Sequence, residues 1–373
     1  MEGKEMVMEE GLATQTQTQT QRQAHQQESK DPKHFLSLLL NFTLVLLGAG
    51  GPFLLRVYFI HGGSRKWLSS WLQMGAGWPV LLLPLSISYR RRHQHNTKLL
   101  SITPRLAGAC SVLGLLFGLD CYLFAYSSAY LPVSTSSILF STQLAFTALF
   151  AFFIVRQRFT PYSVNSIILL TLGSVALGLK SGNDRPEGVS SAQYLIGFVM
   201  TLAAAALYGL LIPLTQLVYE KSKLKITFPL LMEVSLVISF FSGGLCLVGM
   251  LVNKDFQAIP REAREFGLGE SKYYILIVCD AIIWQVCNVG LYGLLLYASA
   301  LLAGVGTAVL VPLIQLLGVI LLHEKLDQLK GLALALSIWG FASYLYGEHR
   351  QMKKMKKMKK MKDTAALELP SRQ

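Results

Sequence analysis

Residues 48–58 read GAGGPFLLRVY, and residues 209–219 read GLLIPLTQLVY. The two stretches share four residues at equivalent places, which are Gly48 with Gly209, Pro52 with Pro213, Val57 with Val218 and Tyr58 with Tyr219. Each stretch lies inside a long apolar run, where one shared residue alone carries little weight. Their common order predicts an internal duplication, which is a frequent design of secondary transporters.

Further matches continue the duplication in the same order along the chain. Gly173 corresponds to Gly340. A longer set of matches pairs Tyr126, Ser128, Ala129, Leu131 and Leu139 with Tyr297, Ser299, Ala300, Leu302 and Leu310, with one constant spacing between the partners. Five spans in each half would invert the second half in the membrane, so that the two halves rock about a central site.

The composition is that of a membrane protein. Apolar residues make up 52% of the 373-residue chain and charged residues only 15%, against about 25% charged in an average soluble domain. This balance excludes a soluble enzyme and a nucleic-acid-binding module, despite the net charge of +13. All five cysteines lie in apolar runs without close histidine partners, so we expect neither a disulfide framework nor a metal site.

Ten apolar runs are long enough to cross a bilayer, which takes about 20 residues. They are residues 35–60, 67–88, 104–127, 133–155, 160–179, 192–219, 229–252, 272–297, 300–322 and 329–347. The predicted fold is therefore an all-α membrane protein, with ten transmembrane helices arranged as a 5+5 inverted repeat. The first repeat covers 35–179 and the second 192–347, joined by a loop at 180–191.

The two tails differ in character, and both are expected in the cytoplasm. The N-tail, 1–34, is acidic at its start and rich in glutamine, which predicts disorder. With the N-terminus inside, Lys and Arg number 23 in the cytoplasmic segments and 11 in the outer segments. The C-tail, 348–373, holds eight positive charges within residues 350–362. Its basic run either contacts anionic lipid or is a solvated charge run that fixes topology.

Several longer stretches of the chain are distinctive. They are 62–68 (GGSRKWL), 72–79 (LQMGAGWP), 130–137 (YLPVSTSS), 141–148 (STQLAFTA), 160–166 (TPYSVNS), 184–188 (DRPEG) and 201–210 (TLAAAALYGL). Together these stretches resemble the plant purine permeases. They stand in the family's order and span about residues 40–347. One departure follows Glu233, because the family often has a glutamine two positions later, where this chain has Ser235.

The resemblance implies a ten-helix inverted repeat of the drug/metabolite transporter superfamily. It further implies proton-coupled uptake of adenine, cytokinins and related N-heterocycles, driven by the proton gradient without a cofactor. We expect a multi-pass protein of the plasma membrane rather than of the vacuole or another endomembrane. The sequence carries no expectation of oligomeric state.

A purine site needs an aromatic platform for the ring face and amide or carboxyl groups for the ring edge. Polar side chains inside membrane helices are costly and are therefore candidates. The substrate-binding candidates are Gln73, Trp78, Gln143, Trp284, Gln285, Asn288 and Tyr292. Each amide has an alternative role, since it can simply bond to a neighbouring helix.

Proton coupling needs an acid that can become neutral, which burial in a low dielectric favours. Glu233 ranks first among the acids inside spans, followed by Asp120 and then Asp280. Glu233 and Gln73 fall at comparable places in the two halves, so their side chains are expected to face each other across the repeat axis. Pro52 and Pro213 are the hinge candidates, because a proline inside a helix removes one backbone hydrogen bond.

Other functions remain open at this stage. A carrier of phosphate esters would need buried Lys or Arg, and the spans hold no central basic residue. A membrane enzyme would need a metal cluster, phosphate loop or nucleophile motif, and none is present in the sequence. A carrier of another neutral or weakly basic N-heterocycle, or a receptor that does not transport, fits the same pattern.

Overall fold

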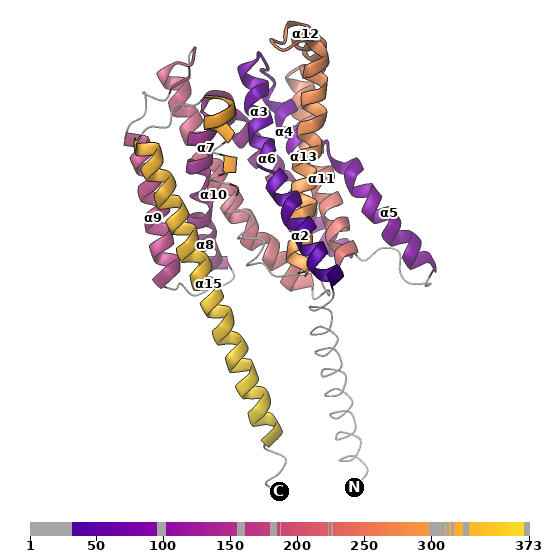
Figure 1. Cartoon of the computed structure of the whole chain (residues 1–373). Helices are drawn as coiled ribbons and strands as arrows, with labels where there is room; N and C mark the ends of the chain where they lie inside the picture. Colours follow the sequence, from indigo (N-terminus) through magenta and orange to yellow (C-terminus); the bar gives the residue numbers. More distant parts are fainter. Residues whose placement is uncertain are drawn as a thin grey trace.

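A computed structural model of the chain describes residues 32–94, 102–154, 161–179, 185–186, 188–222, 224, 227–297, 310, 313–314, 317–323 and 328–368. All the regular secondary structure among these residues is helical (Figure 1). Seven helical stretches in this part of the chain are long and apolar enough to cross a membrane. The all-helical, multi-pass part of the prediction is therefore confirmed.

The helices follow the expected spans closely. Their bounds are α2 Pro32–Leu47, α3 Gly50–Ile60, α4 Lys66–Met74, α5 Trp78–Gln94, α6 Pro104–Tyr130, α7 Val133–Phe140, α8 Gln143–Ile154, α9 Pro161–Leu179, α10 Ser191–Ser222, α11 Phe228–Val252, α12 Asp255–Glu265, α13 Glu270–Tyr297 and α15 Gln328–Glu368. The expected span at 300–322 lies mostly outside the described residues, as does the N-tail. Ten spans and the 5+5 arrangement therefore stay predictions.

Three spans predicted as single helices are interrupted. The first breaks at Gly48 and Ala49, whose N–H groups bond three residues back, to the carbonyls of Val45 and Leu46. Such tight turns replace the regular four-residue bonding pattern and so let a helix change direction without losing its hydrogen bonds.

The other two interruptions have different local causes. The turn at 75–77 follows α4, where a Cβ atom added to Gly75 would lie 2.5 Å from the Cα atom of Gly243 on α11. At Ser141 and Thr142, both hydroxyl groups bond to the carbonyls three residues back, at 2.6 Å and 2.7 Å. Side chains that compete in this way for backbone carbonyls interrupt or bend a helix.

The two hinge candidates occupy unlike positions. Pro52 lies in the first turn of α3, where its missing N–H costs no helical bond. Pro213 lies within the 32-residue α10, which continues through it. The helix of the first predicted span is therefore interrupted at the repeated motif, whereas the equivalent helix α10 is continuous there.

The helices form one bundle whose two ends differ. The short helix α12 lies at one end, and α2 begins and α15 leaves the bundle at the opposite end (Figure 1). We call the end with α12 the distal end and the other the proximal end. No sequence pattern predicted α12, whereas the basic C-tail continues α15 as a helix to Glu368. Lipid contact by that extension stays a prediction.

Close packing of α13 on α2 joins the two predicted halves. A Cβ atom added to Gly290 would lie 2.8 Å from the backbone oxygen of Asn41 and 3.0 Å from the backbone nitrogen of Val45. Backbone atoms cannot move aside as side chains do, so this contact requires glycine.

We therefore expect Gly290→Val to destabilise the protein by about 1–3 kcal/mol, the usual cost of overpacking. Thermal unfolding of the detergent-solubilised protein would show a lowered midpoint. Gly244→Val on α11 is the matched control, because nothing lies within 4 Å of a Cβ atom at that position. Equal midpoints for the two variants would contradict the packing described.

Candidate functional site

A cavity of about 230 Å³ lies between the helices at the level of the three interruptions. Gly48 lines it at the first break, Gln73 and Met74 lie just before the second, and Ser141 and Gln143 flank the third. Irregular backbone at membrane depth is tolerated where it is packed in protein or lines a cavity. The breaks therefore supply the space that a small ligand would occupy.

Aromatic rings form much of the cavity wall. They belong to Phe117, Phe124, Phe140, Tyr208, Trp284, Phe341 and Tyr344. The first five of these rings meet edge to face, with centroid distances between 5.3 Å and 6.2 Å. Contacts of this kind are favourable between aromatic side chains and keep the ring set in a fixed arrangement. Such a wall suits a flat aromatic ligand.

The position of Trp284 depends on a glycine of α3. A Cβ atom added to Gly51 would lie 2.7 Å from the indole ring of Trp284. Asp280 lies one turn earlier on α13 and is buried, but the indole nitrogen and the carboxyl oxygens have no hydrogen-bond partner among the described residues. Gly51 therefore limits where the ring can lie from the side of α3, and Trp284 lines the cavity.

Gln73 is oriented by two backbone carbonyls. Its amide nitrogen donates to the carbonyl oxygens of Ser69, at 3.3 Å, and Cys121, at 3.2 Å. The amide oxygen remains available to accept a hydrogen bond. Asp120 lies beside Cys121 on α6 and also lines the cavity. Its side chain is buried, and its Oδ1 atom has no partner among the described residues.

Further polar groups come from α7, α8 and α13. Asn288 and Gln143, both substrate-binding candidates from the sequence, line the cavity. Ser136 and Ser137 also line it, but their hydroxyl hydrogens bond to backbone carbonyls three residues back, at 3.1 Å and 2.9 Å. Their oxygens can therefore accept hydrogen bonds from a ligand without leaving a buried donor unpaired.

Several predicted site residues lie elsewhere. Trp78 is 45% exposed and does not line the cavity. Gln285 is buried against Gly77, where an added Cβ atom would lie 2.6 Å from the Cβ atom of Gln285. Asp280 is fully buried and does not line the cavity. The side chain of Tyr292 falls outside what the structure describes.

Glu233, the first-ranked acid, is buried on α11 but lies near the start of α6 rather than at the cavity. Its Oε2 atom accepts a hydrogen bond from the backbone nitrogen of Ile102 at 2.8 Å. Of the two side chains expected to face each other, Gln73 lines the cavity and Glu233 does not. This hydrogen bond ties the carboxylate of Glu233 to the backbone just before α6.

Sequence reasoning missed most of the aromatic wall. In the sequence, Phe117, Phe124, Phe140 and Tyr208 look like ordinary packing residues, since aromatic side chains are common in membrane helices. One signal is available for Tyr208, because it directly precedes Gly209 of the repeated motif. No comparable signal marks the three phenylalanines.

The charge of the cavity lining determines which ligands the cavity suits. Among the described residues, no Lys, Arg or His lines it. Arg56 is buried on α3 and donates to the carbonyls of Ser128 and Ala129, each at 3.0 Å. Lys330 is buried on α15 and donates to Ser134 Oγ at 2.8 Å. The cavity therefore suits a neutral or weakly basic ligand better than a phosphate ester.

The model of a family described as purine nucleobase transmembrane transport matches residues 36–354. The chain belongs to the purine permease family. Purine permease 3 of Arabidopsis thaliana is 43% identical over 317 residues, covering 83% of this chain and 90% of the relative. Purine permease 2 of the same plant is 44% identical over 350 residues, covering 89% and 96%. The resemblance found in the sequence is confirmed.

Family membership makes the chain an integral membrane transporter rather than an enzyme. One solved crystal structure shares the fold, with a TM-score of 0.54 and 13% identity. That similarity covers 84% of this chain and 98% of the other.

The two tryptophans predicted for the site give a direct test of the cavity. Trp284→Ala should raise the apparent KM for purine uptake about 5- to 150-fold, because stacking on one base contributes about 1–3 kcal/mol. Trp78→Ala is the control and should leave KM unchanged. An unchanged KM in Trp284→Ala, measured by initial rates of radiolabelled uptake, would place the ligand elsewhere.

Proposed function

We propose that this chain is a proton-coupled carrier of purine nucleobases, adenine among them, and of purine derivatives such as cytokinins. The observation that carries the proposal is the cavity itself, where Asp120 lies among seven aromatic side chains without a basic residue in the described lining. The rings suit the faces of a planar heterocycle. The names of the relatives supply the purine class.

The hydrogen-bonding groups of the cavity fit the edge of an amino-purine. The amide oxygen of Gln73 can accept from a ring or exocyclic N–H group. Asn288 and Gln143 can each make paired hydrogen bonds of the kind amides make to adenine. The uncharged cavity wall also admits apolar substituents on the exocyclic nitrogen, as cytokinins carry.

Asp120 is the acid we assign to proton coupling, in place of Glu233. A carboxyl group in a cavity of low polarity is held neutral more easily than one in water. Asp120 lines the cavity, and its Oδ1 atom has no partner among the described residues. The carboxyl group of Asp120 can therefore both take up a proton and contact the cargo. Glu233 is bonded to backbone and does not contact the cavity.

For the architecture we propose ten spans in two inverted halves, with both termini in the cytoplasm of a plasma-membrane protein. Helix interruptions at the cavity support a transporter of this kind, since such carriers bind cargo at broken helices near the midplane. The common end at which α2 begins and α15 leaves supports the placement of the termini. The driving force is the proton gradient, without a cofactor.

The proposal is tested by uptake of radiolabelled adenine in yeast lacking its own purine carriers. Uptake should be saturable, higher at external pH 5 than at pH 7, abolished by a protonophore and competed by a cytokinin. A protein that reaches the cell surface but neither accumulates nor binds adenine would instead favour a carrier of another N-heterocycle.

Asp120→Asn should remove the dependence on external pH, so that uptake at pH 5 no longer exceeds uptake at pH 7. The amide keeps the shape of the side chain but cannot take up and release a proton. Glu233→Gln is the matched control and should keep the wild-type ratio at equal surface expression. A lost pH ratio in Glu233→Gln and a preserved one in Asp120→Asn would refute the assignment.

A further inference from the structure

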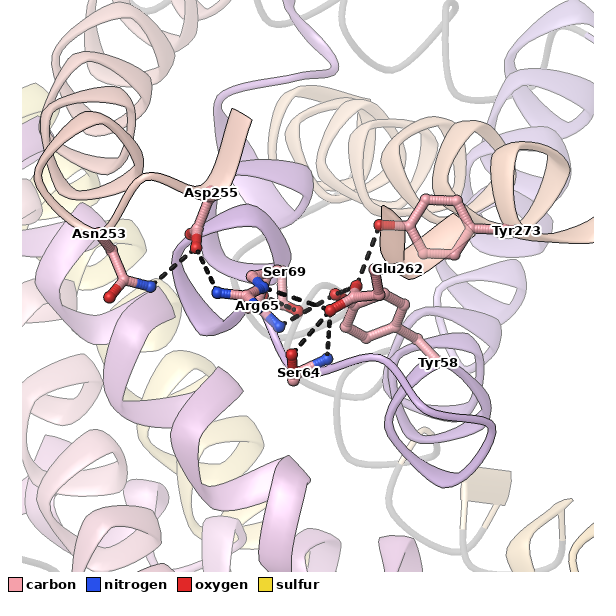
Figure 2. A network of polar contacts seen from close by, with 8 residues as sticks. All are labelled: Tyr58, Ser64, Arg65, Ser69, Asn253, Asp255, Glu262 and Tyr273. Carbon is pink, nitrogen blue, oxygen red and sulfur yellow. Dashed lines mark hydrogen bonds and ion pairs between the residues drawn. The ribbon is translucent and has the colours of Figure 1, made fainter. Parts of the chain in front are cut away.

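A second group of polar side chains lies at the distal end, outside the cavity (Figure 2). Glu262 of α12 is at its centre, with only 7% of its surface exposed. Its carboxylate accepts hydrogen bonds from the backbone nitrogen of Ser64 at 3.0 Å and from Ser64 Oγ at 2.7 Å. Arg65 Nε adds an ion pair at 3.4 Å. The loop between α3 and α4 is thus attached to α12.

Two tyrosines extend the group to α3 and α13. The hydroxyl groups of Tyr58 and Tyr273 both donate to Glu262 Oε1, the latter at 3.1 Å. The Tyr58 hydroxyl also accepts from the backbone nitrogen of Arg65 at 3.1 Å. Gly63 fits beneath the Tyr58 ring, which would lie 2.5 Å from an added Cβ atom. The loop can therefore approach α3 this closely only with glycine there.

Arg65 joins a second acid of α12 to the group. Its Nη1 atom lies 3.5 Å from Oδ1 of Asp255, which also accepts from Asn253 Nδ2 at 2.7 Å. Asp255 is fully buried, and burial raises the pKa of its carboxyl, although Asn253 and Arg65 act in the opposite direction. One arginine of the first predicted half therefore bridges two buried acids of the second. We name the group the distal latch, formed by Tyr58, Ser64, Arg65, Asp255, Glu262 and Tyr273.

Three helices, α3, α4 and α13, run from the distal latch to the cavity. On α3, Tyr58 follows Pro52, which lines the cavity, by six positions. On α13, Tyr273 precedes Trp284 by eleven positions. At 1.5 Å per residue these separations are about 9 Å and 16 Å. The start of α4 is at the latch, and its last two residues, Gln73 and Met74, line the cavity. The same helices that hold the cavity thus meet at the latch.

We propose that the distal latch holds the distal end closed over the cavity, and that its opening is a step of the transport cycle. In a carrier whose halves rock about a central site, contacts between the halves at one end must break before that end opens. Tyr58 and Arg65 belong to the first predicted half, and Glu262 and Tyr273 to the second. Glu262 is a positioning residue, since it acts through the helices and does not touch cargo. The inference rests on the proposed function, which makes the cavity the cargo site.

The first experiment measures access to the cavity without using cargo. Ser137→Cys places a thiol in the cavity lining, in a background with the lining cysteines Cys121 and Cys287 and the exposed Cys279 changed to serine. A membrane-impermeant methanethiosulfonate reagent is applied from each side of the membrane. Gln257→Cys, at an exposed position of α12, establishes in separate samples which side carries the distal end.

We expect Glu262→Gln to raise the labelling rate of the cavity thiol at least 10-fold from the distal side only. The amide removes the ion pair with Arg65 and cannot accept at both former carboxylate positions. Arg65→Gln should have the same effect, and the double variant should add nothing, because both changes break one junction. The matched control is Glu265→Gln, which breaks the exposed pair with Arg261 on the same helix.

Two results would contradict the proposed role of the distal latch. One is an unchanged distal labelling rate in both Glu262→Gln and Arg65→Gln at normal surface expression. The other is an equal rise from both sides, which would indicate a loosened fold. Because labelling needs no cargo, these results are independent of whether the protein transports purines.

A cross-linking experiment then tests whether the latch must open. Ser64→Cys and Glu262→Cys, joined by a short bis-methanethiosulfonate reagent, should stop purine uptake until a reductant releases the link. Either single cysteine variant treated in the same way should retain its uptake. Full uptake by the cross-linked protein would show that the distal end need not open there, and would contradict the proposal.

Discussion

A helix in a bilayer must satisfy its own backbone hydrogen bonds, since the lipid offers no partners. This constraint explains where the chain departs from regular helix. Three predicted spans break, at 48–49, 75–77 and 141–142, and the residues at or beside each break line one cavity. The freed groups are satisfied by short turns and by hydroxyl side chains. The cavity and the breaks are thus two aspects of the same feature.

The cavity and the distal latch have opposite chemistry, and the same helices connect them. Within the described lining, the cavity holds aromatic rings and one acid without a basic partner, as a neutral planar cargo requires. The latch concentrates charge, with Arg65 between Asp255 and Glu262. Both acids are buried and share Arg65 as a partner, so removing Arg65 leaves two buried acids without their ion pair. A carrier needs both features. Its cargo site must bind cargo weakly enough to release it, and the contacts that close one end of the protein must be able to form and break.

The all-helical, membrane-spanning character of the fold could be predicted, because the length of an apolar run is a local property of the sequence. The helix breaks could not, since glycine and serine are common in membrane helices without interrupting them. Among the site candidates, Gln73, Asp120 and Trp284 reach the cavity, whereas Trp78 follows the break after α4 and lies outside the lining. An acid inside a span signals burial but not its neighbour, which is why Glu233 ranks first in the sequence. No pattern marks Glu262 for a related reason, as its partners on α3 and in the loop after it lie far earlier in the chain.

The central claim is that purine binds in the cavity between the interrupted helices. Photolabelling of the purified protein with an azido-adenine, followed by peptide mass spectrometry, tests it most directly. The account predicts label on cavity segments of α6, α10 and α13, around Asp120, Tyr208 and Trp284, and its loss when excess adenine is present. Adenine-protected label confined to α12 or the α3–α4 loop would place the cargo at the distal end and contradict the account.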